Sequence, residues 1–379
     1  MRAMPIYLDY NATTPLLPEV VDAMLPYLRE HFGNPSSGHP YGQRARQAIE
    51  GARAQVAALL GCDADEVIFT SGGTEANNLA IRGVAEAHPT KRRVITSVIE
   101  HPATVAPCAY LEDHGWRVER LGVDGFGRVR VDELRRALDG ETLLVTIMHA
   151  NNETGSMQPI AQIARVAREH GALVHTDAAQ SVGKVRSDVR ELGVDLLSIA
   201  GHKLYAPKGV GVLYVRRGVR LRPFVLGAGH EHGLRPGTEN VASIVGLGVA
   251  CELARKRLEA GSDGVRVLRD RLWTRLRGGV PGLALNGHET DRLPNTLNVR
   301  FPAASGSSVL AAAPEVAAST GSACHEGGEV ASSVLLAMGL DADAALGSVR
   351  LSLGMTTTEG DVDGAADALT RAWRRASDS

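Results

Sequence analysis

The chain has 379 residues, which is enough for two or three domains. Its formal net charge is −2, so the charge balance does not favour a protein that binds nucleic acid or a membrane surface. Hydrophobic residues make up 44% and charged residues 22% of the chain, which excludes a disordered chain or a fibre.

No apolar run reaches the ~18 residues of a membrane helix, and the run from Val241 to Cys251 is short and interrupted by glycine. Residues 1–6 also lack the apolar stretch of a signal peptide. We therefore expect a soluble, cytoplasmic protein.

From about Glu66 onward, short apolar runs alternate with amphipathic stretches. Apolar strands that are separated by helices are typical of a largely parallel sheet buried on both faces, which predicts an α/β fold. The final strand pair is joined through Pro207 and Gly209, so it can include an antiparallel member. The predicted strands are Val67–Thr70, Arg93–Ser97, Leu143–Met148, Ala172–His175, Asp195–Ile199 and Gly211–Val215, and the helices between them are Thr74–Ala87 and Ile160–His170.

A long helix is expected from Asn240 to Leu258, and the rhythm of the sequence changes after it. A strand at Leu293–Phe301, a stretch rich in glycine and serine, and a helix at Ser332–Met338 follow. We predict a large domain at residues 15–258. Residues 1–14 and 259–379 would form a smaller α+β domain.

Polar residues gather where the predicted strands end. One such cluster alone is more often a helix-capping turn, but a cap needs only one polar residue. Ligands bind at the carboxyl ends of strands in open parallel sheets, so five clusters together predict one site. The clusters are Ser71–Thr74, Glu100–Pro102, Asn151–Gly155, Thr176–Gln180 and Gly201–Lys203.

The residue types in these clusters indicate the ligand. Gly73 and Thr74 open a helix after a strand, which suits a phosphate ester, although the lysine of a nucleotide P-loop is absent. Asp177 ends an apolar strand and would need a cation such as a protonated ring nitrogen. Lys203 offers an amine for a Schiff base. His101 offers a ring that could stack on a flat ligand, although a lone histidine usually has a structural role. Together these groups predict pyridoxal 5′-phosphate.

The four cysteines show neither a C-x-x-C pair nor metal-ligand spacing, so we expect no metal. Cys62, Cys108 and Cys251 are interpreted as small buried hydrophobic residues. Cys324 lies among Gly, Ser and Ala residues, which give its thiol little to pack against.

Nine motifs extend the pattern nearly from end to end: Tyr7–Pro15, Gly33–Ser37, Phe69–Asn78, Glu100–Ala103, Asn151–Gly155, His175–Gln180, Gly201–Lys203, Arg235–Asn240 and Gly321–Cys324. In this order the chain resembles cysteine desulfurases of the NifS/IscS type, within the class V aminotransferase-like enzymes. The resemblance implies their pyridoxal-phosphate-dependent transferase fold (fold type I, aspartate aminotransferase-like). In that fold the small domain carries the loop with the catalytic cysteine.

The resemblance also implies roles for matching residues. Lys203 would hold the cofactor as a Schiff base, Asp177 would pair with its ring nitrogen, and His101 would stack on its ring and shuttle protons. Gln180 and Asn152 would bind the ring substituents of the cofactor. Gly73, Thr74 and His202 would bind the cofactor phosphate, and in a homodimer Thr238 would reach the phosphate in the other subunit. Asn152 and Arg350 would bind the substrate; without the resemblance, Arg350 would be read as a surface ion pair.

Cys324 would attack the sulfur of L-cysteine, leaving alanine and a Cys324 persulfide. The sulfur would pass to a protein acceptor, such as an iron–sulfur scaffold, or serve thio-modification of nucleic acid. We expect no direct contact with nucleic acid or a membrane.

Three alternatives stay open. Ala323–Gly327 and Ser333–Leu336 also resemble selenocysteine lyases, so the choice between sulfur and selenium is undecided. An aminotransferase or β-lyase would use the same cofactor. A non-catalytic sulfur-delivery scaffold would need neither Lys203 nor Cys324. The chain departs from many relatives at Ala200, where they place a serine that binds phosphate.

Overall fold

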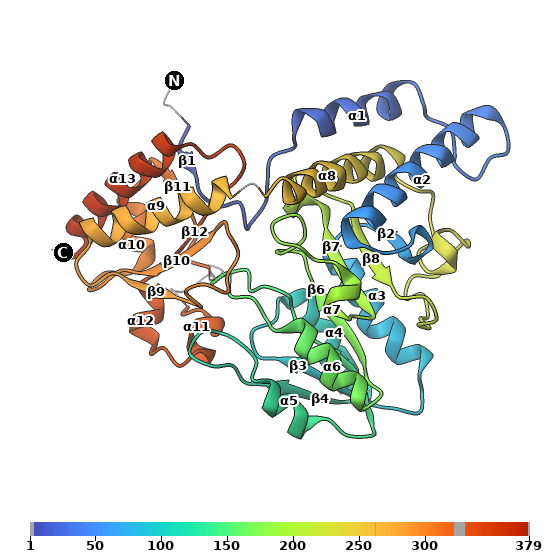
Figure 1. Ribbon diagram of the computed structural model, residues 1–379, viewed down its shortest axis with the longest axis horizontal. Coiled ribbons are helices and arrows are strands. Elements are labelled where there is room, and N and C mark those ends of the chain that lie inside the picture. Colours follow the sequence, from blue (N-terminus) through green and yellow to red (C-terminus); the bar gives the residue numbers. More distant parts are fainter. Residues whose placement is uncertain (1–3, 262, 322–329, 378–379) are drawn as a thin grey trace.

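The computed structural model describes residues 4–261, 263–321 and 330–377 of the chain (Figure 1). Its largest sheet has seven strands in the order β2-β8-β7-β6-β5-β3-β4. Strand β8 is antiparallel to both its neighbours, and all the other pairs are parallel. The strands are β2 (Val67–Thr70), β3 (Arg93–Ser97), β4 (Arg117–Leu121), β5 (Thr142–Thr146), β6 (Leu173–Asp177), β7 (Leu196–Ala200) and β8 (Gly211–Val215). The predicted α/β fold with an antiparallel member is confirmed.

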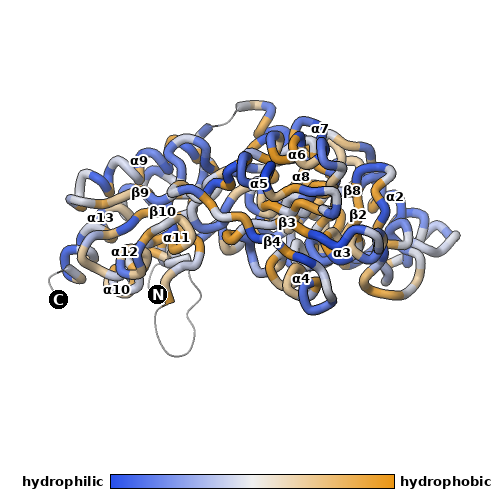
Figure 2. The backbone as a smooth tube through the Cα atoms, turned by 90° about the horizontal axis from the view of Figure 1, so that it is seen from below, coloured by the Kyte–Doolittle hydropathy of each residue, from blue (hydrophilic) through white to orange (hydrophobic). Residues whose placement is uncertain are grey.

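Alternate residues of these strands enter two hydrophobic cores, one on each face of the sheet. On one face, residues such as Val145 pack with the helices α2 (Pro40–Leu60), α6 (Ile160–Glu169) and α8 (Val241–Glu259). On the other face, Leu144 and its counterparts pack with α3 (Gly73–Ala87) and α4 (Pro102–Asp113). Hydrophobic stretches accordingly concentrate around β3, β8 and α8 in Figure 2. The remaining helices of this part are α1 (Pro18–Arg29), which packs on α8, α5 (Val131–Ala137) and α7 (Val189–Leu192).

A second sheet lies in the other part of the molecule (Figure 1). It has the order β12-β10-β9, with β9 at Ala284–Asn286, β10 at Thr296–Arg300 and β12 at Ser348–Ser352. Its core includes residues of α9 (Gly264–Gly279) and α13 (Glu359–Ser377). The N-terminal strand β1 (Ile6–Tyr7) pairs in parallel with β11 (Val316–Ala317), which ties the start of the chain to this region.

Three short helices complete the described part: α10 (Gly306–Ala311), α11 (Ser333–Ala337) and α12 (Ala342–Leu346). Leu335 of α11 and Ala345 of α12 belong to the core of the large sheet rather than to that of the small one. We retain the division between residues 15–258 and the two outer segments as a proposal. The separate cores support it for most of the chain, but α11 and α12 pack on the core of the large sheet.

Local chemistry accounts for several element boundaries. Helix α8 begins after Asn240, whose side chain accepts a hydrogen bond from the Ser243 amide, and α11 begins after Ser332, which caps the Leu335 amide. The burial of Cys108 and Cys251 is confirmed, whereas Cys62 is only half-buried. It follows Gly61, whose left-handed backbone ends α2 and turns the chain towards the surface.

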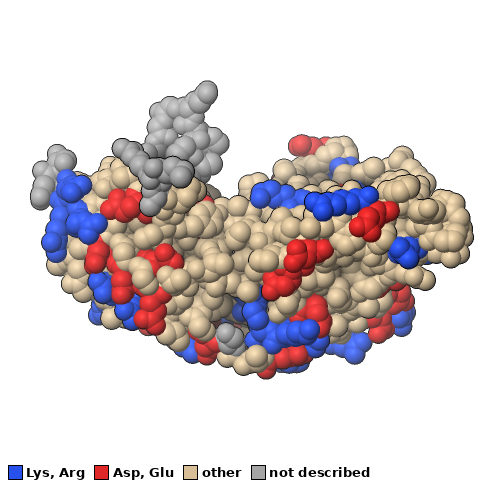
Figure 3. Space-filling model, turned by 90° about the horizontal axis from the view of Figure 1, so that it is seen from above, with Lys and Arg blue, Asp and Glu red and all other residues tan. Residues whose placement is uncertain are grey.

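Among the described residues, no helix is both long and apolar enough to span a membrane. On the face shown in Figure 3, basic and acidic side chains alternate over the described residues. This mixture agrees with the formal net charge of −2.

Candidate active site

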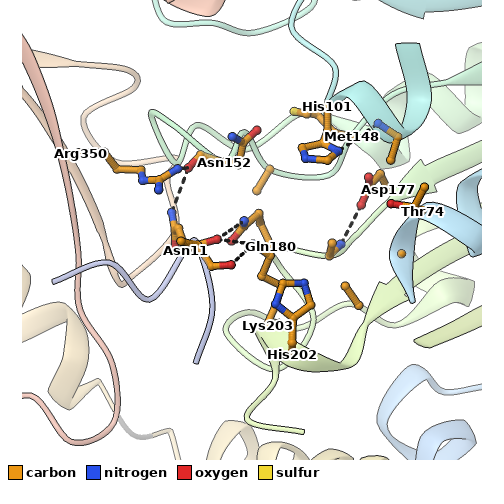
Figure 4. Close-up of a pocket in the computed structure, with 16 residues that line it drawn as sticks. Asn11, Thr74, His101, Met148, Asn152, Asp177, Gln180, His202, Lys203 and Arg350 are labelled. Atoms are coloured by element: carbon orange, nitrogen blue, oxygen red, sulfur yellow. Dashed lines mark hydrogen bonds between the residues drawn. The ribbon is translucent and has the colours of Figure 1, made fainter. Parts of the chain in front are cut away.

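The carboxyl ends of five strands of the large sheet surround a cavity of about 330 Å³ (Figure 4). All five predicted polar clusters contribute to its wall. Arg350 reaches it from β12 of the small sheet, and Asn11 and Ala12 reach it from the N-terminal segment. The predicted site residues on this wall are Gly73, Thr74, His101, Asn152, Asp177, Gln180, His202, Lys203 and Arg350.

Two other candidates are not part of this wall. Thr238 is exposed on the loop before α8 and does not line the cavity of its own chain. Cys324 lies outside the described residues.

Lys203 ends a short 3₁₀ segment, Gly201–Lys203, that follows β7 directly. Its Nζ donates hydrogen bonds to two backbone carbonyls, those of Asn11 and of Ala12, the latter at 2.7 Å. Burial lowers the pKa of Lys203 to about 8, and the positive charge of Arg350 acts in the same direction. A larger share of this amine is therefore neutral near pH 7, as a nucleophilic amine requires.

Asp177 is the last residue of β6 and is only 8% exposed. One carboxylate oxygen accepts a hydrogen bond from the Asn77 amide at 2.7 Å, and the other accepts one from the backbone N–H of Ala179 at 2.9 Å. In the described part of the chain, Asp177 makes no ion pair within 4.0 Å. A buried carboxylate on a cavity wall without a counter-ion suits a ligand that brings a positive charge.

His101 caps the start of α4, because its Nδ1 accepts a hydrogen bond from the Ala103 amide at 3.1 Å. This bond leaves Nε2 to carry the proton of the neutral ring. Burial lowers the pKa of His101, and the charge of Lys203 lowers it further, whereas Asp177 opposes the shift. In Figure 4 the imidazole borders the cavity on the side of Asp177.

The start of α3 forms another part of the wall. This helix has 15 residues and begins at Gly73, so its N-terminal amides and positive dipole end lie beside the Thr74 side chain. A Cβ atom at Gly73 would stand only 3.2 Å from the Cβ of Ala200. Burial together with Lys203 and Lys208 lowers the pKa of the nearby His202 to about 4, so its ring is neutral. This region suits a phosphate group.

Arg350 is buried and held by two fixed partners. Its Nη2 pairs with Asp9 at 2.8 Å, and its Nη1 donates to the Asn152 carbonyl at 3.2 Å. The Nε atom is buried without a hydrogen-bond partner among the described residues. The planar guanidinium is therefore fixed at the edge of the cavity, in a form suited to a carboxylate.

Gln180 is held by two residues for which the sequence predicted no role. Its Nε2 donates to the Asn11 carbonyl at 3.0 Å, and its Oε1 accepts from Lys184 Nζ at 3.0 Å. Asn11 lies in the Tyr7–Pro15 motif, which is a sequence signal for it. Asn77 likewise lies in the Phe69–Asn78 motif, although no role was predicted for it, and no signal in the sequence indicated Lys184.

Taken together, the wall fits pyridoxal phosphate. It offers an amine of lowered pKa, a buried carboxylate without a counter-ion, a flat ring and a helix N-terminus, as this cofactor requires. Within the described ranges, no group of three or more His, Cys, Asp and Glu residues could hold a metal ion.

Comparisons with known proteins agree with this geometry. The family model for aminotransferase class-V matches residues 6–364. A cysteine desulfurase from Trichormus azollae is 49% identical over 360 residues, which cover 94% of this chain and 90% of that protein. A solved NifS-like protein is 37% identical with a TM-score of 0.91, covering 99% of this chain and 100% of the other. A solved structure of SspA in complex with cysteine is also 37% identical, with a TM-score of 0.82 and coverage of 92% and 98%.

Proposed function

Because the chain belongs to the aminotransferase class-V family, among its cysteine desulfurases, we propose that it takes sulfur from L-cysteine with pyridoxal phosphate in the cavity. The products are L-alanine and a persulfide on Cys324. The observation that carries the proposal is the joint placement of Lys203, Asp177 and Arg350 around one cavity.

Each part of the wall would have a task in holding the cofactor. Lys203 would bind it covalently through its amine, Asp177 would pair with its ring nitrogen and His101 would stack on its ring. Gly73, Thr74 and His202 hold the phosphate, and Gln180 and Asn152 bind the ring substituents. When bound, the cofactor supplies an electron sink that weakens bonds around the substrate α-carbon.

The remaining steps depend on side chains of this chain. Arg350 binds and orients the substrate carboxylate, together with Asn152. Lys203 and His101 move protons to and from the substrate. Burial lowers the pKa of Lys203 to about 8, close to neutral pH, and burial also lowers the pKa of His101, which favours its neutral ring.

Cys324 takes the sulfur as a thiolate. Its Sγ forms a bond to the substrate sulfur while the bond between that sulfur and the substrate Cβ breaks. The electron pair of the broken bond stays with the carbon, which takes up a proton and gives alanine. This assignment is based on the sequence, because Cys324 lies outside the described residues.

We also propose a homodimer, in which the exposed Thr238 reaches the cofactor phosphate of the partner subunit. The persulfide sulfur passes to a protein acceptor, such as an iron–sulfur scaffold or a component of nucleic-acid thio-modification. A cytoplasmic location is part of the same proposal.

The test is turnover of L-cysteine by the purified protein, measured as alanine and sulfide in the presence of a thiol reductant. Lys203→Ala should abolish turnover, and so should Cys324→Ser, whereas Cys62→Ser, at a half-buried cysteine away from the cavity, should retain it. Full activity of Cys324→Ser would overturn the persulfide route, and retained turnover of Lys203→Ala would overturn the covalent attachment.

The same assay with L-selenocysteine decides the alternative substrate. A kcat/KM far higher for selenocysteine, with no activity on cysteine, would assign the selenium reaction. A protein that stays colourless with added pyridoxal phosphate would instead indicate a non-catalytic scaffold.

A further inference from the structure

A second cavity, of about 600 Å³, lies beside the candidate active site but shares no lining residue with it. Its wall combines the end of α8, the first turn of α9 and the segment that connects β12 to α13. Lys184 and Tyr205 contribute from the large-sheet region. The proposed reaction uses none of these residues.

Arg257, near the end of α8, is a cation without a counter-ion in this wall. Its Nη1 is buried and has no hydrogen-bond partner among the described residues. The guanidinium lies 5.7 Å from the centre of the Tyr205 ring, and the cause of its lowered pKa is burial, with no carboxylate acting on it. Of the three other charged side chains on the wall, two are already paired, Arg266 with Asp263 and Glu359 with Arg271, which leaves Lys184.

Lys184 adds a second positive charge to the wall. Its Nζ donates to two neutral amide oxygens, of Gln180 at 3.0 Å and of Asn11 at 3.3 Å. It makes no ion pair within the described part of the chain. Burial lowers the pKa of Lys184 to about 7, and the charges of Lys203 and Arg350 lower it further, so an anion nearby would favour its charged form.

The rest of the wall is suited to an aliphatic group. It is lined by apolar side chains from three segments of the chain: Leu258, Val265, Leu268, Pro294, Leu353 and Met355. A fully hydrated inorganic anion would gain little from such surroundings, whereas a carboxylate with a hydrocarbon body would use both the charge and the apolar surface.

The backbone of Tyr205, on the same wall, has a conformation that is rare for a residue other than glycine. Its φ of 63° is in the left-handed region, which is costly for a residue with a side chain. The strained conformation is held by the Thr14 hydroxyl, which accepts from the Tyr205 amide at 2.9 Å, and by the Met355 amide, which donates to the Tyr205 hydroxyl at 2.9 Å. These two hydrogen bonds fix the residue whose ring lies beside Arg257.

We propose that the second cavity binds a small organic carboxylate, with Arg257 and Lys184 meeting its charge and the apolar side chains packing on its hydrocarbon body. This proposal goes beyond the cysteine reaction and does not depend on it. Two observations carry it: the wall holds two cations, Arg257 and Lys184, that make no ion pair within the described part of the chain, and its carboxylate, Glu359, is already paired with Arg271.

The test uses hexanoate as the probe and the full-length protein loaded with pyridoxal phosphate. Binding is measured by calorimetry and by ligand-observed NMR. Arg257→Met keeps most of the apolar stem and removes the charge, and it should weaken hexanoate binding about tenfold or more. Arg255→Met is the matched control, because Arg255 lies on the same helix but pairs with Glu252 and Glu259.

Arg350→Gln separates the two cavities. Unchanged hexanoate affinity in this variant and in Arg255→Met, with a loss in Arg257→Met, would support the proposal. Hexanol, which lacks the charge, should bind equally to the wild type and to Arg257→Met. Binding that is lost in Arg350→Gln but kept in Arg257→Met would place the probe in the candidate active site and overturn the proposal, and so would an absence of binding to the wild type. Because this assay measures no turnover, its outcome is independent of the desulfurase test.

Discussion

Lys203 and Arg350 face the same cavity from different sheets, and the positive charge of Arg350 lowers the pKa of Lys203. Since burial acts in the same direction, the amine should become neutral at about pH 8 rather than near its ordinary value of about 10.4. The rate at which the cofactor-free protein attaches pyridoxal phosphate should therefore rise with pH and level off above about 8.

Arg350→Gln tests the electrostatic part of this relationship. Without the guanidinium charge, the pKa of Lys203 rises, and the midpoint of the pH–rate curve should move upward. Arg371→Gln serves as control, because Arg371 pairs with Glu315 at the surface. Stopped-flow absorbance gives the curve, and identical midpoints for the wild type and Arg350→Gln would contradict the assignment.

The buried carboxylate of Asp177 should be needed for its charge rather than for its shape. Asp177→Asn retains the size of the side chain but cannot balance a cationic ring, and losing one partner of a buried charge pair costs about 2–5 kcal/mol. The dissociation constant for pyridoxal phosphate should therefore rise by more than tenfold, as fluorescence titration of the cofactor-free protein would show. Asp113→Asn, at an exposed position, should bind the cofactor as the wild type does.

Glu100 makes stability depend on pH. Burial raises its pKa to about 8, although hydrogen bonds from Ser97 and from the Met148 amide oppose the shift. In the unfolded chain its pKa is about 4.3, so between these values the folded state binds more protons, and its stability falls as pH rises.

Glu100→Gln removes this titration and keeps an acceptor for the Met148 amide. The difference between the unfolding free energy of the variant and that of the wild type should therefore increase as pH rises from 5 to 8. The increase should be up to ~1.4 kcal/mol per pH unit. Urea unfolding at several pH values measures both curves. His149 and His175 also have lowered pKa values, which reduce stability below pH 6.5. This effect is the same in both proteins, so it cancels when they are compared at the same pH. Parallel curves would show that Glu100 titrates normally.

Arg53 and Glu231 form a buried ion pair, with Nη2 and Oε1 2.7 Å apart. Glu231 also accepts a hydrogen bond from the Phe69 amide, so this pair fixes the loop before α8 to strand β2. Arg53→Met should lower the free energy of unfolding by about 3–5 kcal/mol, because it leaves Glu231 buried and without a cation. The double variant Arg53→Met/Glu231→Gln should recover much of that loss.

Arg46→Met is the matched control in the same helix. Arg46 is exposed and, among the described residues, bonds only to the Pro35 carbonyl, so its loss should cost about 1 kcal/mol or less. Chemical unfolding of the four proteins compares them, and equal losses for Arg46→Met and Arg53→Met would contradict a special role of the buried pair.

The sequence predicted the interior of the large sheet well, because continuous apolar runs produce strands that are buried on both faces. The bounds of β2, β3 and β8 agree with the prediction. Strand β4 was missed because three of its five residues are charged, and it forms the edge of the sheet, where polar side chains meet water.

The candidate site, like the fold, was predicted in part. Residues at strand ends were found from their positions, since topology alone brings those ends together. Arg350 comes from the other sheet, and only the resemblance indicated it. No role was predicted for Asn77 or Lys184, because their importance depends on contacts with Asp177 and Gln180 that only the folded chain creates.

Lys184 provides the last test, since it fixes the orientation of the Gln180 amide. By donating to Oε1, it leaves Nε2 of Gln180 as the donor beside the Asn11 carbonyl.

Lys184→Met removes the ammonium donor to Gln180 and should weaken binding of pyridoxal phosphate about fivefold, as expected for the loss of one hydrogen bond of about 1 kcal/mol. Lys184→Gln retains an amide donor and should restore part of the affinity, and Lys256→Met, at an exposed lysine paired with Glu252, should have no effect. Chemical unfolding of the cofactor-free variants separates a loss of affinity from a loss of stability, since Lys184→Met also removes the donor to the Gln180 and Asn11 amide oxygens. Wild-type affinity in Lys184→Met, together with unchanged absorbance of the bound cofactor, would show that Gln180 is oriented without it.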